Sequence, residues 1–356
     1  MLKMSDKNTD HGIRTIYWKN NKAILIDQTK LPGKLEYITI DNYKKMAKAI
    51  KVMNIRGAPA IGVAAGFGMA LAALQIPDSA EQTEFLSKIT EAYNILSKTR
   101  PTAVNLFWAL NRIMKLIKNN NTDILNLKKL IVDEALKIAK EDYEINKKMA
   151  DIGATLVKQN YKIVTHCNAG ALATSGIYGT ALGVIKRAHE LGKNIFVYAD
   201  ETRPRLQGAK LTAFELSYEG IPHKVISDNM FSYICYKKEV NCVILGADRI
   251  LATGHVINKI GTSGVAIIAK HYKIPFYVVA PSSTFDLTTQ IENVVIEERD
   301  HTEVTTINGK LIVPKNTDVI NPAFDITPPE LVSAIICEKG IIYPPYNENI
   351  VKIINC

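Results

Sequence analysis

The chain of 356 residues is 47% hydrophobic and 22% charged, which is typical of a soluble globular protein of roughly two domains and excludes extensive disorder. Its formal net charge is +9, but no basic block is interleaved with aromatic residues, so we expect a basic solvated surface and no nucleic-acid partner. Five cysteines without CxxC spacing indicate a reducing compartment and argue against a structural zinc site.

The N-terminal region is predicted to be a short tail followed by strands. Residues 1–15 are polar and lack the apolar core of a signal peptide, which predicts a loose tail and a cytoplasmic protein. Three apolar runs within residues 15–40 predict an antiparallel β meander with a turn at Pro32-Gly33. Asp41 is then expected to cap a helix that closes near Met53.

An Ala/Gly-rich helix is predicted through Gly62 and Ala70, directly after Arg56. An arginine beside glycine and proline at a helix start can present its guanidinium to a phosphate or carboxylate, where the positive helix end adds to the attraction. A surface arginine that caps a loop is the alternative. Residues 57–77 carry no charge and have about the length of a membrane span, but their glycine, alanine and proline content favours a buried helix and no membrane partner.

Helical periodicity continues through residues 84–97, 105–117 and from Asp123 onward. Arg100 stands just ahead of a proline that suits the first turn of a helix, so together with Arg56 it suggests an anion clamp. We place the domain boundary in the helical connection, which predicts two domains: a mainly helical N-terminal domain with the meander, residues 1–150, and a C-terminal domain, residues 151–356.

The second half alternates apolar runs with helical patterns, which predicts a parallel sheet covered by helices on both faces. The predicted strands are KIVTHC, NIFVYAD, HKVISD, CVILGAD and PFYVVAP. Ligands of such sheets bind beyond the carboxyl ends of the strands. The reactive side chains found at those ends are His166, Cys167, Asp200, Asp228 and Asp248.

Cys167 ends a strand that is expected to open directly into a small-residue helix reaching Ile185. Backbone N–H groups at that helix start would bias the thiol toward thiolate. The alternative is a small buried hydrophobe, the commonest role of a free cysteine. Lys259 stands in NKIGTSG, ahead of another helix, and suits a phosphate, although neither a dinucleotide fingerprint nor a Walker A motif is present. The residues alone indicate a phosphate site beside a thiol and a carboxylate.

Two further elements are predicted near the C-terminus. VTTINGKLIV reads as a hairpin with its turn at Asn308-Gly309. Residues 327–330, TPPE, are expected to cap a last helix ahead of Gly340.

Several long segments of the chain resemble the family of methylthioribose-1-phosphate isomerases, which also includes the regulatory subunits of translation initiation factor 2B. The segments are NIRGAPAIG (54–62), RPTAVNL (100–106), THCNAG (165–170), DETRPRLQG (200–208), SDNM (227–230), GADR (246–249), NKIGT (258–262) and NPAFDITP (321–328). The resemblance covers nearly the whole chain. One departure is Ala169, where many relatives have threonine.

The resemblance implies an isomerase of methionine salvage that acts on a five-carbon sugar 1-phosphate, without metal or redox cofactor, as a homodimer with a Rossmann-like C-terminal domain. Position by position, it implies that Asp248 is the proton donor and that Cys167 stabilises the transition state. The implied substrate-binding residues are Arg56, Gly57, Ala58, Arg100, Gln207, Asn258 and Lys259.

The expected chemistry follows from the substrate, whose anomeric carbon carries the phosphate, so that the ring needs acid assistance to open. Asp248 can supply this proton if burial raises its pKa. Cys167 can then act either as the base that removes the C2 proton or as a polar partner of a developing charge. Alternative functions are isomerisation of ribose 1,5-bisphosphate or 5-deoxyribose 1-phosphate, and a non-catalytic regulatory subunit.

Overall fold

The N-terminal part begins with the predicted meander. The computed structural model describes residues 12–354 except residue 102, so most of the predicted tail and Cys356 lie outside the described residues. Strands β1 (Ile16–Lys19), β2 (Lys22–Ile26) and β3 (Tyr37–Ile40) pair antiparallel, as predicted.

The first helix, α1 (Tyr43–Lys51), has a different cap from the predicted one. Its N-cap is Asn42, whose side chain accepts a hydrogen bond of 2.8 Å from the Lys45 N–H. Asp41 contacts the Lys45 ammonium instead. The prediction of Asp41 as the cap was therefore wrong by one residue, because both neighbours have side chains that can cap a helix.

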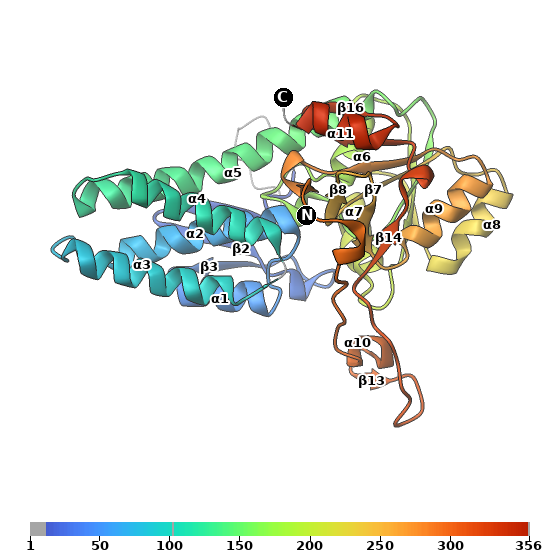
Figure 1. Ribbon diagram of the computed structural model, residues 1–356. Helices are drawn as coiled ribbons and strands as arrows, with labels where there is room; N and C mark the ends of the chain where they lie inside the picture. Colours follow the sequence, from blue (N-terminus) through green and yellow to red (C-terminus); the bar gives the residue numbers. More distant parts are fainter. Residues whose placement is uncertain (1–11, 102, 355–356) are drawn as a thin grey trace.

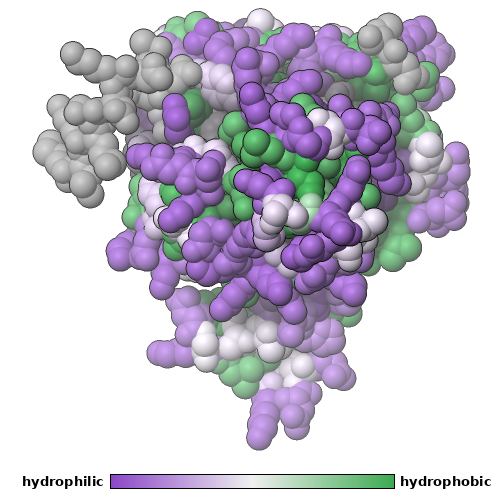
Figure 2. All heavy atoms as spheres, turned by 90° about the vertical axis from the view of Figure 1, so that its left-hand side faces the viewer, coloured by the Kyte–Doolittle hydropathy of each residue, from purple (hydrophilic) through white to green (hydrophobic). Residues whose placement is uncertain are grey.

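Helix α2 (Ala58–Gln75) is the centre of the helical bundle seen on the left of Figure 1. It packs against α1, α3 (Gln82–Ser97), α4 (Val104–Asn119) and α5 (Ile124–Ala154). Within the described residues it alone is long and apolar enough to cross a membrane, yet its side chains are mostly buried by those neighbours. The bundle end of the molecule is largely hydrophilic (Figure 2). This arrangement matches the predicted buried helix.

Helix α5 connects the bundle to the rest of the molecule. It contacts α2 and α4 in the bundle and α6 (Ala181–Glu190) beyond it. The proposed boundary between residues 150 and 151 lies within the last turns of this helix and stays a prediction.

The C-terminal part is built on a seven-stranded sheet in the order β16-β15-β10-β7-β4-β5-β6. All neighbouring pairs are parallel except the edge pair of β15 with β16. The five predicted strands are confirmed, and two more follow them in the chain. The strands are β4 (Lys162–Thr165), β5 (Phe196–Asp200), β6 (His223–Ile226), β7 (Cys242–Gly246), β10 (Phe276–Val279), β15 (Ala334–Cys337) and β16 (Gly340–Ile342).

Helices cover both faces of this sheet, which confirms the predicted α/β fold. Alternate residues of β4 point to opposite faces, so Ile163 packs in the hydrophobic cluster with α6 and α7 (Ala213–Tyr218). Val164 packs in the cluster on the other face, with α8 (Phe231–Tyr236) and α9 (Thr262–His271). Helices therefore shield both faces of the sheet from water.

The strand order reverses beside β4. From β4 the chain continues to β5 and β6 on one side, whereas β7 and β10 lie on the other side. This reversal is a topological switch point, where open α/β sheets bind their ligands beyond the carboxyl ends of the strands. Cys167 and Asp248 follow the two strands that flank it.

A smaller sheet and an arm complete the fold. The sheet has the order β11 (Phe285–Asp286), β8 (Arg249–Leu251), β9 (Val256–Lys259) and β14 (Phe324–Thr327). The connection to β14 carries α10 (Thr302–Thr305) and a hairpin of β12 (Thr306–Ile307) and β13 (Lys310–Leu311), which extends away from the body in Figure 1. The hairpin predicted at Asn308-Gly309 is confirmed.

Two predicted helices are absent where they were expected among the described residues. The helix predicted after residues 327–330 does not form: the chain makes a short 3₁₀ turn (Pro329–Leu331) and then continues into β15. The apolar residues of β15 are instead buried in the sheet between β10 and β16. The last helix is α11 (Tyr346–Ile354).

The helix expected directly after Cys167 is also displaced. Residues 166–180 form a loop with one 3₁₀ turn (Ala171–Ala173), and α6 begins only at Ala181. Positive φ angles at Cys167 (62°), Gly176 (132°) and Ile177 (67°) turn the chain out of a helical path.

Candidate active site

The predicted site residues meet in one cavity of ≈ 120 Å³ between the bundle and the carboxyl ends of the parallel strands. The cavity is lined by all nine residues that the family resemblance implied: Arg56, Gly57, Ala58, Arg100, Cys167, Gln207, Asp248, Asn258 and Lys259. Of the other reactive residues predicted at strand ends, His166 also lines it, whereas Asp200 and Asp228 lie behind its wall.

The start of α2 forms one wall. Gly57 precedes the helix with a φ of +90°, and a Cβ there would lie 2.4 Å from the Ala173 Cα, so a side chain is excluded. No described side chain caps this helix end. Arg56 donates from Nη2 to the backbone oxygen and to Oδ1 of Asn168, at 2.9 and 2.8 Å. The predicted arginine at a helix start is confirmed in position.

Arg100 supplies a second guanidinium from the connection between α3 and α4. Helix α4 begins at Val104, so Pro101 precedes the helix and does not lie in its first turn as predicted. Burial lowers the pKa of both Arg56 and Arg100, but arginine is basic enough to stay charged in proteins. The two cations therefore face the same cavity.

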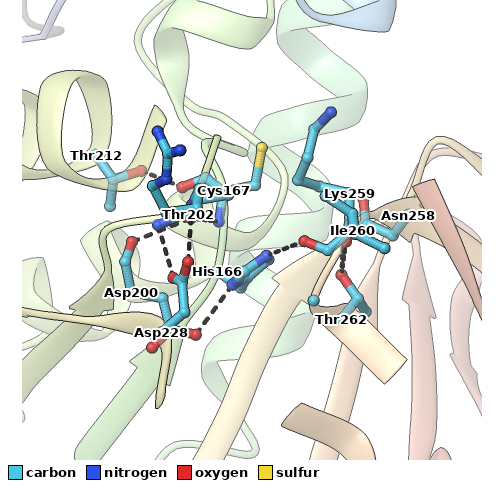
Figure 3. Close-up of polar contacts among 12 residues, drawn as sticks. His166, Cys167, Asp200, Thr202, Thr212, Asp228, Asn258, Lys259, Ile260 and Thr262 are labelled. Carbon is cyan, nitrogen blue, oxygen red and sulfur yellow. Dashed lines mark hydrogen bonds and ion pairs between the residues drawn. The ribbon is translucent and has the colours of Figure 1, made fainter. Parts of the chain in front are cut away.

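Cys167 is held by its backbone. Its N–H donates to Thr202 Oγ1 at 2.8 Å, and its carbonyl accepts from Thr212 Oγ1 at 2.6 Å (Figure 3). Burial raises the pKa of the thiol, against the opposing charges of Arg56 and Lys259. The predicted bias toward thiolate is therefore wrong: no helix starts at this residue, and desolvation outweighs the nearby cations.

Asp248 follows β7 and faces the cavity. Its side chain is exposed to the cavity, and the protein groups that surround it displace part of its hydration; this desolvation raises its pKa. Lys259, Arg56 and Arg100 act in the opposite direction. The net shift is the one that a proton donor requires.

Lys259 and Asn258 lie at the end of β9. The Lys259 ammonium donates to the Ala323 carbonyl at 2.8 Å and lies 5.0 Å from the centre of the Phe324 ring. Burial lowers its pKa. Asn258 donates from Nδ2 to Thr262 Oγ1 at 3.0 Å.

The start of α9 is not free to bind a phosphate, in contrast to what the NKIGTSG segment suggested. The carboxylate of Asp325 accepts hydrogen bonds from the N–H groups of Gly261 and Ser263. The antiparallel pairing of β14 with β9 places Asp325 opposite Asn258, next to this helix end. The positive helix end is therefore already capped, and Lys259 remains as the cation of the segment.

Gln207 and two unpredicted arginines complete the lining. Gln207 is buried, and its Oε1 has no hydrogen-bond partner among the described residues. Arg205 and Arg299 both pair with Glu303, the second through Nε and Oε2 at 3.5 Å. Arg205 lies within the DETRPRLQG motif. Arg299 comes from the long connection before β12, where no periodicity marked it.

Behind Cys167, one group of side chains could approach a metal ion. The ligand atoms of His166, Asp200 and Asp228 lie within 4.8 Å of one another. Spacing along the chain did not indicate this group, because its members follow three different strands. Asp200 Oδ2 contacts His166 Nδ1 at 3.0 Å, and Asp228 accepts from the N–H groups of Thr202 and Arg203 (Figure 3). Hydrogen bonds within the protein thus already engage all three side chains.

Known proteins resemble the chain over nearly its full length. The model of the initiation factor 2 subunit family matches residues 54–344. A methylthioribose-1-phosphate isomerase of Desulforamulus reducens is 51% identical over 343 residues, which cover 96% of this chain and 99% of that protein. The enzyme of the same name from Thermosipho africanus is 52% identical over 340 residues, or 95% of this chain and 97% of that protein.

Two solved structures have the same fold. The 5-methylthioribose 1-phosphate isomerase from Pyrococcus horikoshii OT3 superposes with a TM-score of 0.91 at 44% identity and covers 96% of both chains. Translation initiation factor eIF-2B, subunit delta, from A. fulgidus superposes with a TM-score of 0.88 at 45% identity and covers 97% of this chain and 100% of that chain. Together with the family model, these relatives show that the chain belongs to the initiation factor 2 subunit family, as its motifs indicated.

Proposed function

We propose that the protein is an aldose-ketose isomerase that converts 5-methylthioribose 1-phosphate to 5-methylthioribulose 1-phosphate in methionine salvage. The observation that supports this proposal most strongly is the shared cavity, in which a thiol and a carboxyl of raised pKa lie among five cationic side chains. Relatives about 51% identical over nearly the whole chain bear the name of this activity.

The phosphate is assigned to the cations of the cavity. Arg56, Arg100 and Lys259 together can neutralise a dianion, and the N–H groups at the start of α2 add to the attraction. Gln207 and Asn258 are assigned to the sugar hydroxyls, and the unpartnered Gln207 Oε1 suits a hydroxyl donor.

Asp248 is the proposed acid. Its proton goes to the ring oxygen as the bond between C1 and that oxygen breaks, which leaves positive charge at C1. Hydrogen then moves from C2 to C1. It travels either as hydride, with loss of the C2 hydroxyl proton, or as a proton removed from C2 and another added to C1 of the enol. Both routes give a C2 carbonyl.

Cys167 is assigned to this second step. To act as a base, Cys167 must be in its thiolate form, but burial raises the pKa of its thiol. The raised pKa favours a role as polar partner of the developing charge over a role as base.

A second candidate substrate is ribose 1,5-bisphosphate, which needs extra cationic groups for its second phosphate. Arg205 and Arg299 line the cavity, but they already face two carboxylates: Glu303 pairs with both, and Glu297 Oε1 lies 4.0 Å from Arg299 Nε. Met53, Pro281 and Phe324 offer apolar surface instead. This balance favours an uncharged C5 substituent. A regulatory role like that of the eIF-2B subunits needs no thiol and acid in one cavity.

The remaining assignments belong to the same proposal. We infer a homodimer that works in the cytoplasm without nucleic acid, membrane, metal ion or redox cofactor. The family resemblance supports the dimer, and the four unpaired cysteines among the described residues support a reducing compartment.

The direct test incubates the purified protein with methylthioribose 1-phosphate, ribose 1,5-bisphosphate or 5-deoxyribose 1-phosphate and follows the ketose carbonyl by carbon-13 NMR. We expect turnover of the methylthio compound with the highest kcat/KM. A higher kcat/KM for either of the other sugars would reassign the substrate, and no ketose from any of them would favour the regulatory role.

A further inference from the structure

His166 and Asp200 form a buried contact directly behind the cavity. The ring Nδ1 lies 3.0 Å from Asp200 Oδ2, and the ring Nε2 lies 2.9 Å from the backbone oxygen of Ile260 (Figure 3). His166 is 2% exposed and Asp200 is 0% exposed. Both ring nitrogens thus face oxygen acceptors away from water.

For both contacts to be hydrogen bonds, the pair must hold one proton more than a neutral imidazole and an ionised carboxylate have together. A backbone carbonyl can only accept, so Nε2 carries a hydrogen. A neutral imidazole has a single N–H, and its Nδ1 lone pair would then face the Asp200 carboxylate. The extra proton belongs on the ring, because histidine is ordinarily the stronger base of the two.

The surrounding charges help the pair to keep this proton. Asp228 and Asp325 face His166 from two other elements, and Glu201 and Cys235 lie near Asp200. Burial is the largest single influence and alone would lower the pKa of His166, but the hydrogen bond and charge of Asp200, the Ile260 carbonyl and the charge of Asp228 together raise the pKa above its ordinary value. Burial also raises the pKa of Asp200.

The pair links the two strand ends that carry the proposed thiol and cation. His166 directly precedes Cys167, and Ile260 directly follows Lys259. The Asp200 carbonyl accepts from Thr202 Oγ1 at 3.1 Å, and the same hydroxyl accepts the N–H of Cys167. In Figure 3 the Cys167 thiol and the Lys259 ammonium point to the same side of this network.

The turn beside Lys259 is shaped around the ring. A Cβ at Gly261, whose φ is +103°, would lie 2.9 Å from His166 Cε1. Glycine therefore permits the close approach of this turn to the imidazole. The ring is a bridge between β4 and the end of β9.

We infer that His166 and Asp200 are a positioning pair that holds one proton, and that through this ion pair they fix Lys259 relative to the Cys167 thiol. The inference rests on the proposed isomerase function for its kinetic consequence. Its structural part, a doubly protonated and buried ring, can be measured without turnover.

The first experiment is nitrogen-15 NMR of the full-length protein labelled at histidine, with the His166 signals identified by their loss in His166→Gln. We expect both ring nitrogens to carry hydrogen at pH 7.5, with no change on addition of EDTA. A neutral ring would overturn the inference. An Nδ1 signal that changes with EDTA would do so as well, by placing a metal ion at His166, Asp200 and Asp228.

The second experiment compares Asp200→Ala and Asp200→Asn with the control Asp133→Asn, an exposed residue of α5 outside the cavity lining. Misplaced catalytic groups cost about 10²-fold in rate, the loss that we expect in kcat for Asp200→Ala. Asp200→Asn can donate its amide N–H to Nδ1 of a neutral ring and should keep most of the wild-type kcat, as should Asp133→Asn. Equal losses in Asp200→Asn and Asp200→Ala would overturn the positioning role.

A readout independent of substrate separates this inference from the proposed function. The pH dependence of iodoacetamide modification of Cys167, corrected with Cys167→Ser, reports the thiol pKa. Because Lys259 lowers that pKa, Asp200→Ala should raise it, while Asp200→Asn and Asp133→Asn should leave it near the wild-type value. An unchanged pKa in a folded Asp200→Ala protein would contradict the coupling even if no sugar phosphate turned over. If Asp200→Ala does not fold, the NMR signals and the Asp200→Asn kinetics decide.

Discussion

Cys167 and Asp248 follow the adjacent parallel strands β4 and β7, at the place where the strand order of the large sheet reverses, and both side chains line the same cavity. Core packing does not require a thiol and a carboxyl to meet there. The meeting does match the general position of ligand sites in open α/β sheets.

Loss of either side chain should abolish nearly all turnover. Positioned acid-base groups contribute about 10²–10⁴-fold each, so Cys167→Ala and Asp248→Asn should each fall below a tenth of the wild-type kcat while their circular dichroism spectra stay unchanged. Cys235→Ala, a free cysteine outside the cavity lining, is the control. A folded Cys167→Ala or Asp248→Asn protein with more than a tenth of the wild-type kcat would contradict the catalytic role assigned to that residue.

The pH profile should show the proton on Asp248. Burial raises its pKa, and a general acid must be protonated, so kcat/KM should decline as pH rises through that pKa. Asp248→Asn has no such proton, and its residual rate should lose this decline. An unchanged profile in the variant would assign the titration to another group, with Cys167 and Lys259 as the nearest titratable side chains.

Glu303 should select against a second phosphate. Glu303→Gln removes the carboxylate that Arg205 and Arg299 share, and the ratio of kcat/KM for ribose 1,5-bisphosphate to that for methylthioribose 1-phosphate should rise about tenfold, the worth of one charge-assisted hydrogen bond. Glu292→Gln, an exposed residue outside the cavity lining, is the control. An unchanged ratio would remove Glu303 from specificity.

Glu215 should make the stability of the fold depend on pH. This buried carboxyl accepts from Asn168 Nδ2 at 2.7 Å, behind the Asn168 oxygens that hold Arg56, and burial raises its pKa to about 7 from an ordinary 4.5. The folded state then binds more protons than the unfolded state between these values, so its contribution to stability is full below pH 4.5 and is lost as pH rises through 7.

Glu215→Gln tests this contribution. As the pH rises from 5 to 8, the free energy of unfolding of the wild type should fall by roughly 3 kcal/mol relative to that of the variant. Urea titration of both proteins at the two pH values measures this difference. A difference between the two proteins that stays constant from pH 5 to pH 8 would contradict the raised pKa.

Gly57→Ala should damage both the fold and the site. The added methyl would meet Ala173 at a φ that disfavours side chains, so we expect a loss of about 1–3 kcal/mol in unfolding free energy and a higher KM. Gly264→Ala is the control, because nothing lies within 4 Å of its Cβ position and its φ is ordinary. Equal stability of both variants would show that the backbone can yield at Gly57.

Much of the fold could be read from the sequence because its signals are local. The apolar runs of β4, β5, β6, β7 and β10 are short, bounded and separated by helical periodicity, so each was recognisable alone. Their shared direction then brought the reactive residues at their ends to one edge of the sheet.

The rest depends on contacts between distant segments. The cap that Asp325 places on α9 exists only because β14 pairs with β9, and the burial that raises the Cys167 pKa comes from walls contributed by both halves of the chain. Arg299 reaches the cavity from an irregular connection with no periodicity. Such features follow from tertiary packing, which no local pattern encodes.

The proposed phosphate-binding cations come from both halves of the molecule: Arg56 and Arg100 from the helical bundle, Lys259 from the edge of the sheets. A bound dianion would therefore hold the bundle and the sheets together, in addition to helix α5 and direct contacts such as the hydrogen bonds of Arg56 with Asn168. Ligand that binds only the folded state raises its stability with concentration. Substrate would in this way stabilise the fold that binds it.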